Sequence, residues 1–493
     1  MEDEYVKDDD TEIDDANDNG HPFPAKQLFF LALCRIAEPI ALTLVFPFSN
    51  DMIKSFGGEV AEKSGLYNGL FLGSFSMAEM ITAFLWGMLS DKIGRKPVLL
   101  LGCIGTAISM LVIGFSKNIW MAILGRAFGG GLNGNIGVVQ TMVGELVTNP
   151  KHEPRAYTIM PIFYSIGITI GPAIGGYLAK PAESFPSSLG KVRLFVKFPY
   201  LLPNLVCVTM LLVTVCLVVT LLKETHPKIL ERRRRKASQE HGLTDPGNTP
   251  LLSGLDGTAD EAAYGTDSSS SSIFGDPKPS LKVSWKILNP IIAICLLTSH
   301  TLSYIQLIPI FLQAKHDYSV PKYFLGGVGG LERPLWQSGR VMMTGGFVSM
   351  FVQAVLFTMC TNRFGIIRVF AFVTFLHPVV YFTLPYIAFI PDGVWQNVVF
   401  YTWLIIRTIF GVFPYPIFLI FVKRATPDSA MLGRVNGIVA STGAAFRTVS
   451  PPLAGLLQTI GDSHHLSALP WWGTGMLAVV GSIQCWSLVK QFR

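Results

Sequence analysis

The chain has 493 residues, of which 50% are hydrophobic and only 15% are charged. Soluble globular proteins carry about a quarter charged residues, so this composition excludes an ordinary soluble domain and predicts that lipid is the main solvent. The formal net charge of +6 is modest and, without a basic face on a soluble fold, gives no support for nucleic-acid binding.

The first residues are crowded with Asp and Glu and lack the basic start and apolar core of a signal peptide. Residues 1–26 are therefore predicted to form a disordered acidic cytoplasmic tail. A helix that crosses lipid needs about 20 mainly apolar residues. Such runs follow at 27–50, 65–89, 97–116, 119–147, 157–179, 199–222, 286–313, 338–361, 367–390, 396–422, 431–460 and 470–489. The sequence thus predicts an all-α membrane protein with about twelve transmembrane helices.

A polar stretch at 223–285 separates the sixth run from the seventh and is too poor in apolar residues to fold alone. We interpret it as a disordered cytoplasmic linker between an N-terminal six-helix bundle, 27–222, and a C-terminal six-helix bundle with a short cytoplasmic end, 286–493. Basic residues gather in the loops on one side, which predicts that both termini lie in the cytoplasm.

The two halves contain corresponding features. Arg126 lies in the fourth run and Arg407 in the tenth, 281 positions later, and Gly171-Pro172 in the fifth run corresponds to Ser450-Pro451 in the eleventh, 279 positions later. Nearly constant offsets indicate two pseudo-repeated halves that run parallel to each other. This is a known layout of membrane transporters.

Two carboxylates fall inside predicted spans. Glu38 follows Arg35 by three residues, so both share a helix face, and Glu79 lies on a stripe of small residues in the second run. An acid inside a membrane helix is a functional-site hypothesis by default, which makes Glu38, Arg35 and Glu79 candidates for proton coupling. The alternatives are a static ion pair for Glu38 and a helix-packing carboxylate for Glu79.

A loop that reads GMLSDKIGRKP and begins at Gly87 joins the second and third runs. Gly87 is expected to permit close helix contact, Asp91 to pair with neighbouring helices and Gly94 to turn the chain. Arg95 and Lys96 are expected to keep the loop on the cytoplasmic side. These residues are candidates for conformational gating, and a simple basic loop is the alternative.

The fourth run carries a polar face on which Arg126 and Asn133 are seven residues apart. That face is too polar for lipid, so we expect it to line a central cavity, with Arg126 as a proton-coupling candidate. An intramembrane Arg costs about 2.5–3.5 kcal/mol on insertion scales and needs a partner. Backbone carbonyls are the structural alternative.

The fifth run places Gly167, Gly171 and Gly175 four residues apart, so that a neighbouring helix can approach closely. Pro172 removes one hydrogen bond and bends the helix. A bent helix with a flat glycine face suits a rocking interface between the two halves. The alternative is ordinary packing of small residues.

Three side chains of the second half are candidates for the cavity wall: Arg407, His300 in the seventh run and Tyr415 in the tenth. A lone membrane His is more often a hydrogen-bonded packing group, and most aromatic residues in such helices pack or face lipid. Both alternatives stay open for His300 and Tyr415.

Together, the loop GMLSDKIGRKP, the segment LGRAFGGG around Arg126 and the segment GITIGPAIGG around Gly171 resemble the major facilitator superfamily over about 27–490. The last segment is similar to the antiporter motif of its drug:proton antiporter branch. Arg35-x-x-Glu38-Pro39 and the later run 433–437 are similar to zinc-induced facilitator-like transporters and their fungal relatives. The resemblance implies alternating access, a solute site near the bilayer midplane and a proton gradient as driver.

We therefore expect a secondary active transporter that exports a small organic solute, drug or secondary metabolite by proton antiport. Solute–proton symport for nutrient uptake and a non-transporting receptor or scaffold are the alternatives. The expected partners of this monomer are a small-molecule substrate, protons and the lipid bilayer, either of the plasma membrane or, as the alternative, of the vacuole.

The sequence gives no sign of enzymatic chemistry. It contains no P-loop and no nucleophile elbow, and its seven cysteines lie in or beside apolar runs rather than at metal-ligand spacing. Neither an enzyme activity nor a cofactor, a metal or a nucleic-acid partner is expected.

Overall fold

The computed structural model describes residues 23–147, 153–227, 229–232, 235, 284–316, 329–426 and 429–492. The predicted tail, 1–26, and the predicted linker, 223–285, therefore lie for the most part outside the described residues. Within the described ranges the chain is helical apart from turns, loops and one isolated bridge between His316 and Gly329.

Six long helical runs come from the first half of the chain. They are α1 (Ala25–Thr43), α4 (Ser64–Ile93), α5 (Arg95–Gly114), α6 (Ile119–Gly131) with α7 (Asn135–Leu146), α8 (Glu153–Leu178) and α11 (Leu201–Leu221). Short helices occupy the connections: α2 (Ser49–Ser55), α3 (Gly58–Glu62), α9 (Pro181–Ser184), η2 (Leu189–Lys191) and α10 (Arg193–Lys197).

Six long runs also come from the second half. They are α13 (Trp285–Gln313), α14 (Leu335–Phe351) continued by the π-helical η3 (Val352–Leu356) and α15 (Phe357–Phe364), α16 (Ile366–Thr383) continued by η4 (Leu384–Phe389), α17 (Val394–Val412) with α18 (Pro414–Ala425), α19 (Ser429–Ser463) and α20 (Leu469–Phe492). The all-α fold predicted from the sequence is confirmed.

Nine helical segments of the described part are long and apolar enough to cross a membrane. The other long runs are α1, the broken pair α6–α7 and α19. The helices α6 and α7, of 13 and 12 residues, are each too short to cross alone. The helices α1 and α19 are less apolar because they carry polar residues, such as Glu38 and Arg447, that line an internal cavity.

The first run ends earlier than predicted. The sequence pattern extends it to residue 50, but α1 stops at Thr43 and the chain continues through turns into α2. Pro47 has no backbone N–H and cannot continue the helical hydrogen-bond pattern. The last carbonyls of α1 are thereby left free for other donors.

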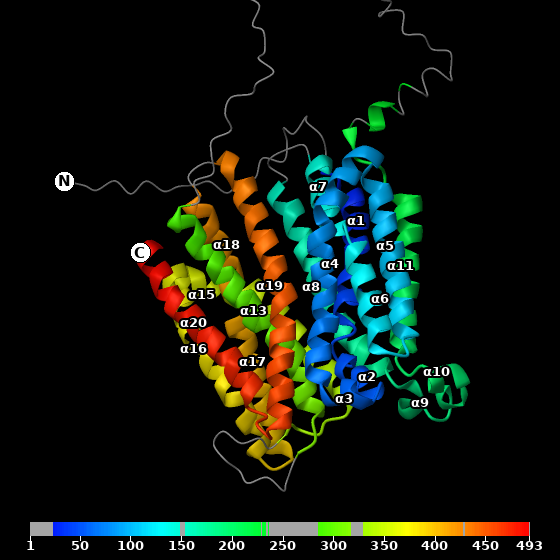
Figure 1. Ribbon diagram of the computed structural model, residues 1–493. Helices are drawn as coiled ribbons and strands as arrows, with labels where there is room; N and C mark the ends of the chain where they lie inside the picture. The colour runs from blue at the N-terminus through cyan, green and yellow to red at the C-terminus, as the bar shows by residue number, and fades with distance from the viewer. Residues whose placement is uncertain are drawn as a thin grey trace, which may run out of the picture.

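The helices of each half pack into a bundle of their own, and the two bundles meet along α4 with α19 and α8 with α14 (Figure 1). We call the side on which α1 begins the terminal side and the opposite side, where α4 begins, the distal side. A Cβ added at Gly69 would lie 2.2 Å from the carbonyl oxygen of Pro451, and one at Gly176 would lie 2.6 Å from the Cα of Gly339. Glycine thus lets the two backbones touch near the distal side.

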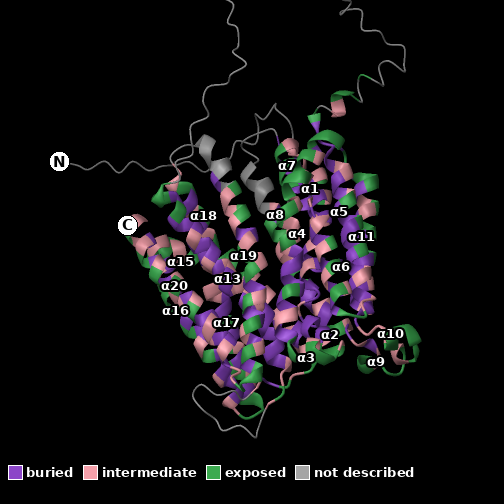
Figure 2. Ribbon diagram, viewed as in Figure 1, coloured by how far each residue is buried: buried purple, intermediate pink, exposed green. Residues whose placement is uncertain are grey.

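Side chains are buried where helices face each other and exposed on their outer faces (Figure 2). Large apolar residues are among the exposed ones, such as Phe84 with 74% and Trp395 with 77% of its surface exposed. A soluble monomer rarely shows many such residues. Their number here indicates that the outer faces contact lipid.

Candidate functional site

A cavity of about 460 Å³ lies between the two bundles. Its wall is formed by α1, α4, α6 and α8 of the first bundle and by α13, α14, α17 and α19 of the second. This volume lies in the range of small-molecule sites, which are mainly apolar with a few convergent polar groups. The charged and strongly polar residues of the wall are Glu38, Glu79, Arg126, Asn133, Gln306, Arg407 and Arg447.

Two carboxylates of the first bundle are joined by one amide. Asn133 donates a hydrogen bond from Nδ2 to Glu38 at 3.0 Å, and the same nitrogen lies 3.4 Å from Glu79. Asn133 occupies the break between α6 and α7, which frees its side chain from a regular helix surface. Glu38 also forms an ion pair with Arg35, whose guanidinium lies over the ring of Tyr164. The structure therefore brings together Arg35, Glu38, Glu79 and Asn133, of which the sequence had paired only Arg35 with Glu38.

Arg447 contributes a positive charge to the cavity wall from the opposite bundle. It belongs to α19, and its charge acts on Glu79 and on Tyr164 of the first bundle. The sequence analysis did not single out Arg447. Its signal was an Arg inside a membrane run, four residues before a proline pair, but its position opposite Glu79 depends on how the bundles meet.

Arg126 is bound to the backbone of α1. Its guanidinium donates hydrogen bonds to the carbonyl oxygens of Ala41, at 3.3 Å, and Leu42, at 2.8 Å, and only 1% of its surface is exposed. These carbonyls lie in the last turn of α1, where the helix leaves acceptors unpaired and favours a cation. The carbonyl partners expected under the structural alternative are thus present, and Arg126 also reaches the cavity wall, so its part in proton coupling stays a prediction.

The second bundle presents polar groups without partners. Arg407 lies flat over the ring of Tyr304, with its Cζ 3.4 Å from the ring centroid. Its Nε and Nη2, both polar atoms of the Gln306 side chain and Oγ1 of Thr301 have no hydrogen-bond partner among the described residues. Gln306 and Thr301 were not predicted as site residues, because uncharged polar residues are common in membrane helices.

Two predicted cavity residues of the second bundle do not line the cavity. His300 is buried behind it, where Nδ1 lies 3.0 Å from the hydroxyl of Tyr381, which is itself 3.2 Å from Nε2 of His377. Tyr415 is 51% exposed on α18. The prediction for Tyr415 was wrong because α17 ends before Pro414, which starts a new helix with a different phase. His300 is thus a hydrogen-bonded packing group, which was the alternative considered for it from the sequence.

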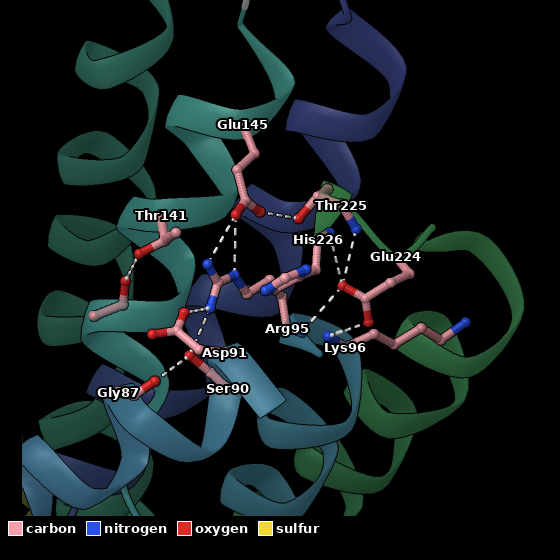
Figure 3. Close-up of polar contacts among 11 residues, drawn as sticks. Gly87, Ser90, Asp91, Arg95, Lys96, Thr141, Glu145, Glu224, Thr225 and His226 are labelled. Carbon is pink, nitrogen blue, oxygen red and sulfur yellow. Dashed lines mark hydrogen bonds and ion pairs between the residues drawn. The ribbon is translucent and has the colours of Figure 1, made fainter. Parts of the chain in front are cut away.

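The loop between α4 and α5 is fixed by Arg95 (Figure 3). Its guanidinium donates to Ser90 at 2.8 Å, to Asp91 at 2.6 Å and to one oxygen of Glu145, at the end of α7, at 2.9 and 3.1 Å. Gly94 turns the chain with a φ of +107°, a conformation that glycine adopts readily. Asp91, in the last turn of α4, thereby pairs with the first residue of α5, the next helix, as expected.

The same loop is tied to the chain that follows α11. The carboxylate of Glu224 accepts hydrogen bonds from the backbone N–H groups of Arg95, at 3.0 Å, and Lys96, at 3.2 Å, and so caps α5 (Figure 3). Lys96 Nζ donates to the last carbonyls of α11, at 2.8 Å, and Thr225 donates to Glu145 at 2.5 Å. Sequence reasoning missed Glu224 and Glu145 as partners because each is far from the loop along the chain.

Gly87 does not make the close helix contact predicted for it. A Cβ added there would meet nothing within 4 Å. Gly87 is exposed and lies on the same face of α4 as Gly69 but about five turns further along, beyond the glycines at which α4 touches α19.

The glycine stripe of α8 packs inside the first bundle. A Cβ added at Gly167 would lie 2.5 Å from Pro39, one at Gly171 2.2 Å from Thr43 and one at Gly175 1.9 Å from the carbonyl oxygen of Leu44, all on or just after α1. The predicted contact of this stripe with the other half is therefore wrong.

The face of α8 that touches the second bundle is the opposite one. Pro172 belongs to it and lines the cavity, and its carbonyl oxygen would lie 2.6 Å from a Cβ added at Gly339 of α14. The stripe of glycines and this face leave α8 closely packed on both sides.

Two helix bundles of corresponding order, around a mainly apolar cavity with a few convergent polar groups, are the architecture of a membrane transporter. The Major Facilitator Superfamily model matches residues 31–451, and the chain belongs to this family. The resemblance and the fold predicted from the sequence are thereby confirmed.

Several known proteins are similar to this chain. It is 37% identical to the Major facilitator superfamily multidrug transporter mfsB of Aspergillus fumigatus, over 95% of this chain and 84% of the relative. It is 27% identical to Protein ZINC INDUCED FACILITATOR 1 of Arabidopsis thaliana, over 88% and 84%. Among solved structures, a bacterial homolog of the human lysosomal transporter Spinster, in an inward-facing and occupied conformation, matches with a TM-score of 0.65 at 13% identity, over 96% of this chain and 98% of that one. That likeness concerns the fold alone.

Proposed function

We propose that this protein is a proton-coupled exporter of small organic molecules that works by alternating access. The observation that carries the proposal is the pair Glu38 and Glu79, joined by Asn133 in the wall of a cavity between two bundles. Ionisable residues at this depth in a membrane are expensive and mark proton or substrate pathways.

The position of the cavity supports alternating access. Along α4, α8, α14 and α19 the cavity residues lie closer to the terminal side than a set of glycines at which the bundles touch, namely Gly65, Gly69, Gly176, Gly339 and Gly455. On α4, for example, Gly65 and Gly69 pack against α19, and the cavity residues Ser76 and Glu79 follow them. The packed glycines therefore seal the cavity from the distal side. With the termini in the cytoplasm, as we propose from the basic loops, this is an inward-facing state.

Coupling follows from charge. A carboxylate in an apolar cavity is favourable only when a proton, a cation or water compensates it. Arg447 supplies such compensation for Glu79 from the opposite bundle. Rocking of the bundles moves α19 relative to α4 and changes that compensation, so a proton is bound in one state and released in the other. Protonation of Glu79 can shift the balance between the two states only because the two states differ in their affinity for the proton.

The direction of transport is supported by the relatives. The fungal protein with 37% identity is named a multidrug transporter, and another relative, 32% identical over 36% of this chain, is the Efflux pump azaK of Aspergillus niger. We further propose that the protein acts as a monomer in the plasma membrane. The vacuolar membrane is the second candidate, in which case export from the cytoplasm fills the vacuole.

Transport by sealed vesicles tests the proposal. Vesicles containing the protein are given an acid interior and an extract of source cells, and mass spectrometry reports which compounds accumulate. We expect at least one compound to accumulate only when the gradient is present, in the wild type and in Glu59→Gln, which removes an exposed acid between α2 and α4.

Loss of that accumulation in Glu38→Gln and Glu79→Gln would support the proposed roles. Accumulation only with an acid exterior would replace antiport by symport. No gradient-dependent compound, with folded protein in the vesicles, would contradict the proposal.

A further inference from the structure

The cavity wall formed by the second bundle contains donors that nothing in the described chain uses. Arg407 is 8% exposed and Gln306 1% exposed, and both reach the cavity. The Nε and Nη2 of Arg407 and both side-chain polar atoms of Gln306 lack a hydrogen-bond partner among the described residues, as does Oγ1 of Thr301 nearby. Buried polar groups are nearly always satisfied, so this concentration on one wall is unusual.

The charge of Arg407 makes the lack of partners more consequential. A buried guanidinium without a counter-charge is strongly unfavourable. The ring of Tyr304 covers one face of the guanidinium and offsets part of this cost through a cation–π interaction. That contact leaves the in-plane N–H groups on Nε and Nη2 unused by the described residues, and this edge of a guanidinium can bind a carboxylate in a fork geometry.

In the corresponding residue of the first bundle, Arg126, both Nη atoms have acceptors and only Nε lacks a partner among the described residues. Arg126 donates to two carbonyls at the end of α1. In the second bundle α13 remains helical to Gln313, and although Pro309 leaves the carbonyl of Ile305 without its helical donor, neither Nε nor Nη2 of Arg407 has an acceptor among the described residues. The described residues thus provide two carbonyl acceptors for Arg126 but no acceptor for Nε and Nη2 of Arg407.

We propose that Arg407, Gln306 and Thr301 form an anion subsite of the cavity, and that the cargo is an organic acid whose carboxylate binds there. The inference rests on the proposed function and adds the chemical class of the cargo. Glu38 and Glu79 on the opposite wall repel an anion and therefore orient its carboxylate towards Arg407. The apolar body of the cargo lies against the side chains between these poles, such as Ile308 and Leu404, which also line the cavity.

A matched pair of probes separates charge from shape. Naphthalene-2-carboxylate and naphthalene-2-carboxamide differ only in the group aimed at the subsite. Thermal unfolding of the purified full-length protein is followed at increasing probe concentration, since a ligand that binds the folded state raises the melting temperature. We expect a concentration-dependent rise with the carboxylate and at least a tenfold weaker effect with the carboxamide.

Arginine variants locate the binding. Arg407→Gln should abolish the rise caused by the carboxylate. Arg340→Gln should keep it, because Arg340 also lies over an aromatic ring of the same bundle, that of Trp336, but is not among the residues of the cavity wall. Gln306→Met, which is similar in volume, should weaken binding of the carboxylate about tenfold by removing hydrogen bonds to a charged group. This variant serves as the test if Arg407→Gln does not fold.

Equal effects of the two probes on the wild type, or an unchanged rise in Arg407→Gln or Gln306→Met, would overturn the inference. The proposed function fails separately. If only neutral or cationic compounds accumulate with the gradient, the anion subsite is contradicted and proton-coupled export is still supported. If the protein binds the carboxylate specifically but transports no compound, the anion subsite is supported and the proposed export is contradicted.

Discussion

Arg126 and Arg407 occupy corresponding places in the two bundles, yet their surroundings differ. Arg126 is held by the free carbonyls at the end of α1, whereas Arg407 faces the ring of Tyr304 in the middle of the longer helix α13. One proline-containing turn after α1 accounts for this difference, because it ends the helix at Thr43. Two copies of one architecture can therefore give one Arg a structural role and leave the other available to a ligand.

The acids show the same asymmetry. Glu38 and Glu79 belong to the first bundle and are bridged by Asn133, and the wall opposite them is cationic and aromatic. We infer a division of labour in which the first bundle handles protons and the second binds the cargo. The following changes break or sharpen that comparison.

The largest effect is expected for Glu38→Gln. This change keeps the size of the side chain and its hydrogen bond with Asn133 but removes a proton-binding group, so gradient-driven accumulation should fall to the level of empty vesicles. The vesicle assay with an acid interior measures it, beside Glu59→Gln as the control. Full accumulation in a correctly inserted Glu38→Gln protein would remove Glu38 from the coupling mechanism.

The two arginines should differ in their effect on stability. Arg126→Met removes hydrogen bonds from a charged donor to two carbonyls and should lower the free energy of unfolding by about 2–3 kcal/mol. Arg407→Met removes a charge whose Nε and Nη2 lack partners among the described residues, and should leave stability within about 1 kcal/mol or raise it. Thermal unfolding of the two variants and of the wild type in detergent measures the difference in stability. Equal losses would show that the two arginines are held alike.

Gly171→Leu tests the packing of α8 on α1. The new Cβ would lie 2.2 Å from the hydroxyl of Thr43, and overpacking of this kind typically costs about 1–3 kcal/mol. We expect a loss of about 2 kcal/mol in thermal unfolding. Gly87→Leu is the control, because a Cβ there meets nothing within 4 Å. If both variants were equally stable, the close contact of α8 with α1 would be in doubt.

The smallest effect is expected for Glu224→Gln. Its carboxylate caps α5 through the N–H groups of Arg95 and Lys96, and loss of a helix cap typically costs about 1 kcal/mol. Hydrogen exchange at the start of α5 should therefore become about fivefold faster, while exchange in α13 stays unchanged. An equal change in both helices would indicate a global effect instead of a local cap.

Much of this architecture was predictable from sequence because it depends on local patterns. Apolar runs of membrane length predict the helices, and the motif around Gly94 and Arg95 predicts a turn at the end of α4. Residues on one helix face, such as Arg126 and Asn133, were assigned to the cavity wall on which they lie.

The remaining features depend on contacts between segments far apart in the chain. Arg447 gains its place opposite Glu79 only when the bundles meet, and Glu145 and Glu224 reach Arg95 only once three helices have packed. The glycine stripe of α8 predicts that some helix lies close but does not identify α1 as that helix. Tyr415 was misplaced because the break before Pro414 shifts the phase of the helix.

The most direct test of the division of labour compares two transport modes of Glu79→Gln in the same vesicles. The compound that wild-type vesicles accumulate is measured once with an acid interior and once without a gradient, as exchange of labelled for unlabelled compound. We predict that Glu79→Gln loses gradient-driven accumulation and keeps exchange, because the cargo wall and the rocking of the bundles are intact. Unchanged accumulation, or loss of exchange as well, would contradict the assignment of proton coupling to the acids of the first bundle.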